Sequence, residues 1–264
     1  MPPPPPFLDI DLRGRIDPYF ARILLGFADL EPTAAGLRLV VDGAPEGVLS
    51  DAELNDLRGA RRRDLPWRPP LRLEVAAVAS HPAGQLRGTA GFGLWNDPFD
   101  PAQGTAAPPS AVWFFNTSPP ANMPFAPGGA PHGWKAATLN GGTLPEWLAA
   151  TGATLLRTPG LGSLLYKVAR HSAVRAAEAV LTSRLDERHV YRIDWRADHA
   201  DFWVDGQRVL RAPSPPRVPL GFVAWVDNNC ADETGTADLA LRRLAVPQRQ
   251  WLEISRVRIA PLAS

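Results

Sequence analysis

One stretch of the chain decides our interpretation of its fold: HVYRIDWRADHADFWVDGQRV, residues 189–209. Residues 189–195 alternate between apolar and polar side chains, which is the period of a β-strand with one buried face. A short polar turn at residues 197–199 leads into a second run of the same kind. Asp205-Gly206 then favours another tight turn. The stretch therefore predicts a β-hairpin followed directly by a further turn.

Similar runs recur along most of the chain and predict more strands. They lie at residues 36–41, 71–79, 89–95, 111–116, 201–204, 220–226, 237–244 and 251–259. Turn-forming pairs such as Asp42-Gly43 and His81-Pro82 separate them, and 29 prolines exclude long helices over most of the chain. Many short strands with regular breaks indicate a sandwich of two antiparallel sheets.

The length of 264 residues suits one large β-sandwich. Residues 1–18 are rich in proline and predict an extended arm, so we expect a single domain over residues 19–264. One part of the chain breaks the strand series, because it is rich in alanine and leucine and places apolar residues near helical spacing. It predicts a helical insertion at about residues 144–184. Such an insertion packs against the sandwich or forms a lid over its concave face.

Composition limits the classes of partner and compartment. The chain has 28 basic and 27 acidic residues, so the net charge of +1 gives no electrostatic footprint for nucleic acid. A single cysteine, Cys230, leaves no intrachain disulfide, and we therefore expect a cytoplasmic protein. A secreted protein that has lost its leader would have the same sequence. No apolar run of about 18 residues could span a bilayer, and the sequence indicates no oligomeric state.

The hairpin of residues 189–209 also resembles one that is typical of family 16 glycoside hydrolases and their concanavalin A-like relatives. There a Tyr-x-x-x-Trp strand is followed by one that ends in Val-Asp-Gly. Three further segments resemble strands of that family in the matching order: Gly91–Trp95, Leu220–Trp225 and Glu253–Ile259. The resemblance covers about residues 70–260. It implies an all-β, concanavalin A-like jelly roll into which the helical insertion is set.

The family's acid pair has no counterpart where the resemblance places it. That family carries the pair in a Glu-x-Asp-x-x-Glu strand, because alternate positions share a face and a retaining mechanism needs carboxyl groups about 5–5.5 Å apart. The matching strand here is SAVWFFN, residues 110–116, which contains no carboxylate. Glu74 and Asp238 each stand alone in their strands. We therefore expect no replacement pair at that spacing and no retaining hydrolysis.

Aromatic and amide side chains near strand ends predict a ligand site on the concave face. Aromatic rings stack on the C–H faces of sugars, while amide and carboxylate groups bind hydroxyls. Asn and Asp also favour ordinary turns, so a structural role is the alternative for each polar candidate. The candidates are Trp95, Asn96, Trp113, Phe115, Asn116, Trp134, Trp225 and Asn228.

Three functions remain open. The first, which we prefer, is a sandwich that binds a carbohydrate on its concave face without the family's hydrolysis. The second is an enzyme that acts on an apolar or aromatic small molecule in a pocket under the helical insertion. The third is a divergent glycoside hydrolase with a relocated acid pair. The catalytic candidates for an enzyme are Asp97, Asp194, Asp227 and His132.

Motifs for other chemistries are missing from the sequence. No His or Cys spacing is typical of zinc, and no Gly-x-Ser-x-Gly elbow occurs. Cys230 has no neighbouring histidine in the sequence that could activate its thiol. We therefore predict no cofactor. Relatives with this sandwich often hold a structural calcium ion, so the resemblance allows one, although no ligand set is identifiable in the sequence.

Overall fold

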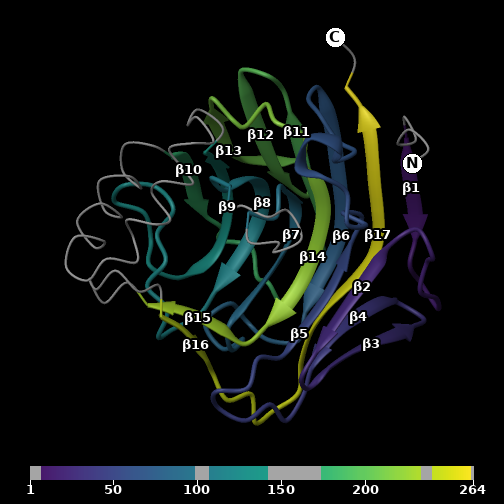
Figure 1. The fold of residues 1–264 in the computed structure, drawn as a ribbon, viewed down its shortest axis with the longest axis vertical. Coiled ribbons are helices and arrows are strands. Elements are labelled where there is room, and N and C mark those ends of the chain that lie inside the picture. The colour runs from purple at the N-terminus through teal and green to yellow at the C-terminus, as the bar shows by residue number, and fades with distance from the viewer. Residues whose placement is uncertain (1–6, 99–106, 142–173, 233–239, 263–264) are drawn as a thin grey trace.

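The computed structural model describes residues 7–98, 107–141, 174–232 and 240–262. Within these ranges the chain forms one eight-stranded and one seven-stranded sheet, both antiparallel, and a small two-stranded sheet. The long strands of the two large sheets are bowed in the same direction and lie over one another (Figure 1). The predicted all-β jelly-roll sandwich of two antiparallel sheets is therefore confirmed.

Strands that lie side by side in the two large sheets are often distant in the sequence. In spatial order, the eight-stranded sheet contains β13 (Gln207–Pro213), β12 (His199–Val204), β11 (His189–Trp195), β6 (Leu71–Ala79), β17 (Gln250–Pro261), β4 (Gly36–Val41) and β3 (Ala28–Thr33), with β1 (Leu8–Asp11) paired to β17. The seven-stranded sheet contains β10 (Arg175–Val180), β9 (Gly133–Asn140), β8 (Ser110–Thr117), β7 (Thr89–Trp95), β14 (Gly221–Asp227), β5 (Asp51–Asn55) and β2 (Ala21–Leu25). The remaining elements are β15 (Asn229–Asp232), β16 (Ala240–Arg243) and the 3₁₀ turn η1 (Arg62–Asp64).

The hairpin of residues 189–209 is confirmed. β11 pairs antiparallel with β12, and β12 continues through the second turn into β13. At that turn Asp205 and Gly206 have φ angles of 48° and 81°, the left-handed values that a tight hairpin turn requires. Because β11 also pairs with β6, the hairpin lies within the eight-stranded sheet.

The prediction of a helical insertion is wrong for those of its residues that the structure describes. Residues 175–180 form β10, an edge strand paired with β9, and the described residues contain no α-helix. The segment RAAEAV has helix-forming residues, but hydrogen bonding along β9 overrides that local preference. Residues 144–173 of the predicted insertion lie outside the described residues. At the other end of the chain, residues 8–11 of the predicted arm form β1 on the eight-stranded sheet.

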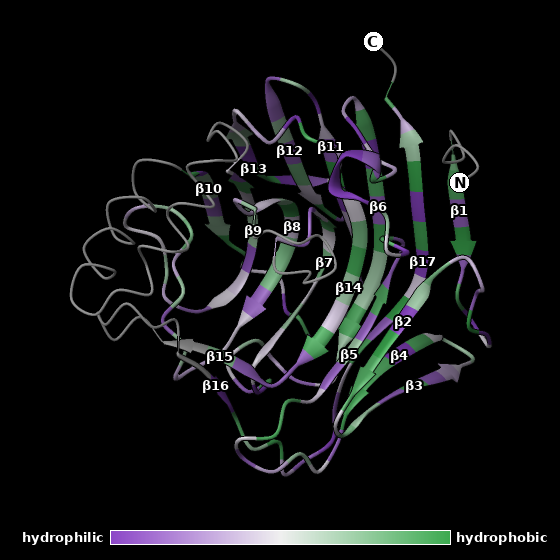
Figure 2. Cartoon of the chain, in the orientation of Figure 1, coloured by the Kyte–Doolittle hydropathy of each residue, from purple (hydrophilic) through white to green (hydrophobic). Residues whose placement is uncertain are grey.

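The hydrophobic core lies between the inner faces of the two large sheets. β6 alternates buried and partly exposed residues along its whole length, and Figure 2 shows alternating hydrophobic and hydrophilic residues on several strands. In the seven-stranded sheet, β8 and β14 do not show this alternation, because they are buried on both faces. Phe92, Phe114 and Tyr191 meet in the core, with ring centroids 4.9–5.7 Å apart.

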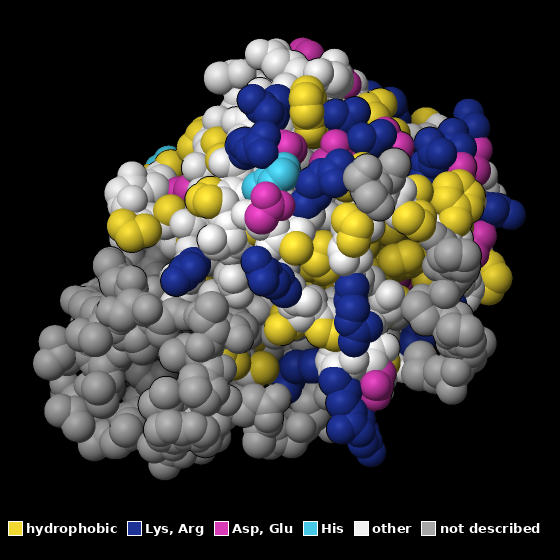
Figure 3. Space-filling view, turned by 90° about the horizontal axis from the view of Figure 1, so that it is seen from above, with side chains coloured by type: hydrophobic (Ala, Val, Ile, Leu, Met, Phe, Trp, Pro, Cys, Tyr) yellow, Lys and Arg dark blue, Asp and Glu magenta, His cyan; other side chains and the backbone are white. Residues whose placement is uncertain are grey.

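The surface at one end of the molecule mixes charges of both signs. Figure 3 shows Lys and Arg side chains interspersed with Asp and Glu there, with hydrophobic side chains between them. This mixture agrees with the net charge of +1. Among the described residues, no helix has the length and apolar character needed to cross a membrane.

Candidate functional site

The candidate site lies on the outer face of the seven-stranded sheet, which is the face turned away from the core. Successive side chains of a strand point to opposite faces. On β5, Ala52 lies in the core, so Asp51 and Glu53 point outward. On β8, Phe114 lies in the core, whereas Trp113 belongs to a separate cluster on the outer face. The sheet thus carries a second buried layer behind the main core.

Aromatic rings form the centre of this outer face. The ring of Trp113 lies 5.1 Å from that of Phe115, 5.5 Å from Trp225 and 5.9 Å from Trp95, measured between centroids. Phe125, from the segment before β9, packs 5.9 Å from Trp113. The structure therefore brings together four of the aromatic residues that the sequence predicted, although they come from three different strands.

Two glycines of β7 make room for the indole rings. A Cβ atom at Gly91 would lie 2.7 Å from the ring of Trp225, and one at Gly93 would lie 2.5 Å from the Cβ atom of Trp113. Both distances are shorter than any normal contact. The Gly-x-Gly spacing of β7 therefore leaves a shallow channel in the sheet that the tryptophans from β8 and β14 fill.

Much of the aromatic cluster is covered. Only 6% of Trp113, 4% of Phe115 and 8% of Trp225 is exposed, and Met123 and Phe125 pack against them. These rings therefore lie largely beneath other side chains and offer little open surface to a ligand. Trp95, at the end of β7, stays partly exposed.

The accessible part of the outer face lies on β5 and β2. Asp51 and Glu53 are partly exposed there. On the edge strand β2, Ile23 pairs with Glu53 and Leu25 pairs with Asp51, and both side chains are about two-fifths exposed, at 39% and 42%. This side of the face thus combines carboxyl groups with exposed apolar surface.

Asp51 and Asp227 lie directly opposite each other on β5 and β14. Asp227 is buried and accepts four hydrogen bonds. They come from the backbone N–H and hydroxyl of Thr89, at 3.1 and 2.8 Å, and from the backbone N–H and amide of Asn229, at 2.9 and 2.8 Å. Trp225 Nε1 donates to the same hydroxyl at 2.9 Å, which links the carboxyl group to the aromatic cluster.

The acidic groups of this face favour their protonated forms. Burial, with the nearby charges of Asp227 and Glu53, raises the pKa of Asp51 to about 8. Burial also raises the pKa of Glu53 to about 7, against the hydrogen bond from Asn55. The pKa of Asp227 is raised by burial too, and its four donors oppose that effect. Asp51 and Glu53 therefore titrate near neutral pH, and burial shifts the pKa of Asp227 in the same direction.

The expectation that no carboxyl pair occupies alternate positions of a strand is wrong. Asp51 and Glu53 stand two residues apart on one face of β5, in the segment DAELN. The segment is short and its polar residues point outward, so it lacks the apolar run used to recognise the other strands. Its alternation of acidic with apolar residues was the signal that could have revealed it.

Asn96 and Asn228 hold loops in place. The amide of Asn96 donates to the carbonyl of Pro108 at 3.0 Å and accepts from the N–H of Ser110 at 2.9 Å. Asn228 accepts from the N–H of Ser50 at 2.9 Å and donates to two backbone carbonyls, each at 2.8 Å. Their amide groups are committed to the backbone, so neither residue belongs to the site.

Trp134 and Asn116 do not lie on the outer face. Trp134 is 2% exposed and packs in the main core, 5.7 Å from Phe92 and 5.6 Å from Tyr191 between ring centroids. Asn116 is fully buried and donates to Ser118 Oγ at 3.3 Å. The residues around Trp134 gave no local sign that its ring turns inward, because the pairing of β9 with β8 decides that direction.

The remaining catalytic candidates are scattered. Asp194 lies on β11 in the other sheet, where Arg72 donates to it at 2.7 and 3.0 Å. His132 is exposed in the loop before β9. Asp97 follows β7 and borders a small pocket together with Arg62, and its charge contributes to the raised pKa of Glu53. Of the four candidates, Asp227 lies on the outer face and Asp97 lies near its edge.

The described residues offer no metal site. No group of three or more His, Cys, Asp or Glu side chains within those ranges is placed to hold a metal ion. The calcium ion that the resemblance allows therefore finds no ligand set there. The pocket predicted under residues 144–184 falls largely on residues outside the described ranges, so that hypothesis stays a prediction.

Comparisons with known proteins support the fold. No family model and no curated protein matches the chain. Among solved structures, a family 16 endo-glucanase from Bacteroides ovatus in complex with G4G3G-2F-DNP has 12% identity and a TM-score of 0.56, over 96% of this chain and 99% of that one. The Crh5 transglycosylase in complex with NAG has 12% identity and a TM-score of 0.54, over 98% and 85%. The Bacillus licheniformis β-glucanase has 11% identity and a TM-score of 0.51, over 97% and 98%. The chain thus has the concanavalin A-like fold of family 16 glycoside hydrolases.

Proposed function

We propose that the chain binds a carbohydrate along the outer face of its seven-stranded sheet. One observation carries the proposal: indole rings share this face with carboxyl groups that form no ion pair with the described residues. Trp95 lies at one end of this strip, opposite Gly221, and Asp227 lies six residues further along β14. At about 3.4 Å per residue the strip is roughly 20 Å long, which is the length of a short oligosaccharide.

The chemistry of the strip suits a sugar. The partly exposed ring of Trp95 offers a flat apolar surface for C–H groups, and the carboxyl groups of Asp51 and Glu53 accept hydrogen bonds from hydroxyls. Exposed Ile23 and Leu25 on β2 add apolar surface along the same side. Two of the structures to which this chain is similar are complexes, one with NAG and one with G4G3G-2F-DNP.

Calorimetric titration with a panel of oligosaccharides tests this proposal. We expect at least one glucan or chitin-type oligomer to bind, and Trp95→Ala to weaken binding about tenfold or more through loss of ring stacking. Trp203→Ala is the matched control, because Trp203 is also partly exposed but lies on the opposite sheet. Absence of heat with every oligomer would count against the proposal.

A second candidate function is cleavage of the bound carbohydrate. It is favoured by the direct opposition of Asp51 and Asp227, since Cβ atoms of such pairs lie about 4.5–5.5 Å apart. Asp227 is held by four donors, whereas Asp51 Oδ1 is buried without a partner. The pKa of about 8 keeps the proton on Asp51 at neutral pH, so Asp51 acts as the acid. The four donors to Asp227 oppose the effect of burial on its pKa, so we assign the carboxylate to Asp227.

The assay for cleavage is product release from β-glucan oligosaccharides. We expect Asp51→Asn and Asp227→Asn each to lower the rate at least a hundredfold. Asp194→Asn, on the other sheet, serves as the control. If the wild-type chain binds the oligomers but releases no product, cleavage is rejected while the binding proposal stands.

A further inference from the structure

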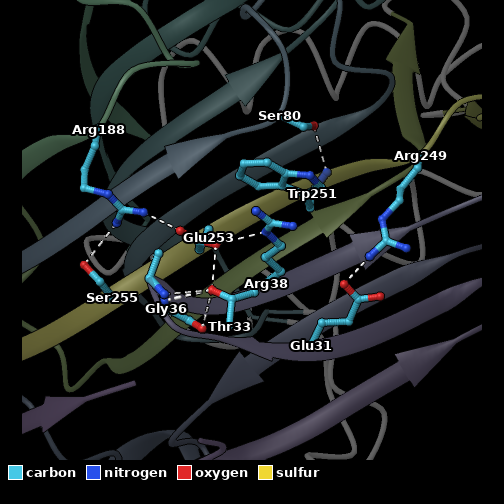
Figure 4. Close-up of polar contacts among 11 residues, drawn as sticks. Glu31, Thr33, Gly36, Arg38, Ser80, Arg188, Arg249, Trp251, Glu253 and Ser255 are labelled. Atoms are coloured by element: carbon cyan, nitrogen blue, oxygen red, sulfur yellow. Dashed lines mark hydrogen bonds and ion pairs between the residues drawn. The ribbon is translucent and has the colours of Figure 1, made fainter. Parts of the chain in front are cut away.

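Cations of the chain neutralise one buried carboxylate on the other sheet. Glu253 on β17 is 2% exposed, and its carboxylate accepts hydrogen bonds from Arg38 Nε at 2.9 Å, from Arg188 and from the Thr33 hydroxyl at 3.0 Å (Figure 4). Two guanidinium groups thus face one carboxylate. The cost of burying the charge is offset within the fold.

Glu178 is also paired with a cation of the protein. This residue of β10 lies on the outer face, at the far side of the aromatic cluster. Its side chain is 4% exposed and lies 3.4 Å from the ammonium group of Lys135, itself fully buried. A cation of the protein accompanies this carboxylate as well.

Asp51, Glu53 and Asp227 form no ion pair among the described residues, and neither does the buried Asp56, which accepts hydrogen bonds from Trp67 Nε1 and the N–H of Phe222. No Lys, Arg or His of the residues that the structure describes forms an ion pair with any of them. Asp227 has only neutral donors, and Glu53 receives one hydrogen bond, from the amide of Asn55 at 2.6 Å. Three carboxyl groups thus gather on one face without a counter-charge from the described part of the chain.

Oxygen atoms around this group also lack partners. Asp51 Oδ1, Asn229 Oδ1 and Thr117 Oγ1 are buried and make no hydrogen bond. Thr117 is fully buried, so it is an independent sign of a missing partner. The positions form one row across the sheet, because Asp51 opposes Asp227 and Thr117 opposes Thr89, which donates to Asp227.

Asn229 Oδ1 can only accept a hydrogen bond, and Asp51 Oδ1 is also an acceptor whenever its carboxyl group is ionised. A ligand group that satisfies these oxygen atoms must therefore bring several N–H or O–H donors. A positive charge on that group would also offset the repulsion among the carboxyl groups. An ammonium group has both properties, with three donors and one charge.

We infer that the outer face selects a cationic amino sugar, an oligosaccharide of the glucosamine type with free amines. This inference rests on the proposed carbohydrate site and names the substrate class of that site. The amine binds at Asp51 and Glu53, and the neighbouring sugar rings extend over the accessible side of the outer face, on β5 and β2, because β14 is buried on both faces. Neutral glucans lack the charge, and N-acetylated oligomers carry an amide in its place.

The test is calorimetric titration at about pH 7, where Asp51 and Glu53, with pKa values of about 8 and about 7, are partly ionised and free sugar amines are partly protonated. The probes are a glucosamine hexamer, an N-acetylglucosamine hexamer, cellohexaose and spermine. We expect the glucosamine hexamer to bind about tenfold more tightly than the two neutral hexamers, and added salt to reduce that difference. Spermine tests attraction to a polycation that has no sugar ring.

Two variants test whether the preference for the glucosamine hexamer arises at Asp51 and Glu53. Asp51→Asn and Glu53→Gln should each lower the affinity for the glucosamine hexamer about tenfold and lower that for cellohexaose less, because only the glucosamine amine loses an ionic partner. Neither carboxyl group forms an ion pair with the described residues, so both variants are expected to fold. Asp194→Asn, which removes a carboxylate from the opposite sheet, is the control and should change neither affinity.

The outcomes separate the inference from the function on which it depends. Equal affinity of the wild-type chain for glucosamine hexamer and cellohexaose would overturn the amino-sugar inference and leave the carbohydrate site in place. Binding of spermine with no binding of any hexamer would overturn both. Tighter binding of the glucosamine hexamer that persists in both variants would place the cation elsewhere and also overturn the inference.

Discussion

Asp51 and Asp227 are direct cross-strand partners, on β5 and β14, and both side chains leave the core for the outer face. Few positions in a sheet bring two carboxyl groups closer. Such a pair lowers the stability of the fold when both groups ionise. Its presence beside a tryptophan cluster is the feature on which the ligand and cleavage proposals depend.

The first prediction concerns the pH dependence of stability. The folded state holds protons on Asp51 and Glu53 up to pKa values of about 8 and about 7, whereas the unfolded chain releases them near pH 4. The folded state therefore binds more protons than the unfolded state across this window. We expect the free energy of unfolding to fall as pH rises from about 5 to about 9, by roughly 2 kcal/mol after allowance for partial solvent exposure. Urea denaturation at each pH measures this.

Asp51→Asn should flatten that pH profile and raise stability at alkaline pH. Asp194→Asn is the matched control, since Arg72 stabilises its charge and the same substitution there should give no gain at alkaline pH. If the free energy of unfolding of the wild-type chain rises from pH 5 to pH 9, the raised pKa values of Asp51 and Glu53 are contradicted.

The second prediction separates two tryptophans. Trp134→Ala removes a ring that is 2% exposed in the main core, so we expect a loss of about 3–5 kcal/mol in unfolding free energy. Trp95→Ala removes a partly exposed ring and should cost clearly less, while saccharide binding weakens. Chemical denaturation and titration of both variants check this. A core-sized loss of stability at Trp95 would show that its ring is mainly structural.

The third prediction tests the glycine channel of β7. Gly91→Ala places a Cβ atom 2.7 Å from the Trp225 ring, so overpacking should cost about 1–3 kcal/mol and alter tryptophan fluorescence. Gly84→Ala is the control, because no atom lies within 4 Å of a Cβ there. Equal effects of the two substitutions on urea midpoints would indicate that the close approach is not maintained in solution.

The fourth prediction concerns Glu253. Glu253→Gln keeps the side-chain shape but removes the charge that Arg38 and Arg188 bind, so we expect a loss of about 1–3 kcal/mol. Glu31→Gln removes one half of a more exposed ion pair with Arg249 and should cost no more than about 0.5 kcal/mol. Thermal and urea denaturation compare them, and a smaller effect at Glu253 than at Glu31 would refute the account.

Most strands with an apolar run could be predicted from the sequence. Residues 71–79 and 89–95 form strands with the predicted limits, because alternation and turn residues are local properties. β5 was missed since its outward residues are acidic, and β10 was mistaken for helix since its alanines also suit a helix. The edge position of β10 and its pairing with β9 are not encoded in its own composition.

The candidate site could be predicted only in part. Trp95 and Trp225 were identified at strand ends, and Trp113 and Phe115 because they share one side of the strand at residues 111–116; the structure places all four together. Asp227 was named only as one of several acids. Its relation to Asp51 depends on the pairing of β14 with β5, and these segments are far apart in the chain.

The sequence by itself determined the class of fold, the hairpin of residues 189–209 and the turn at Asp205-Gly206, because a period of two and left-handed turn residues act between near neighbours. Only the tertiary structure decided which face each strand residue occupies. Trp113 and Trp134 lie on neighbouring strands of the same sheet, yet one lies on the outer face and the other in the core. Register between distant strands makes that choice, since a shift of one residue would turn every side chain to the opposite face.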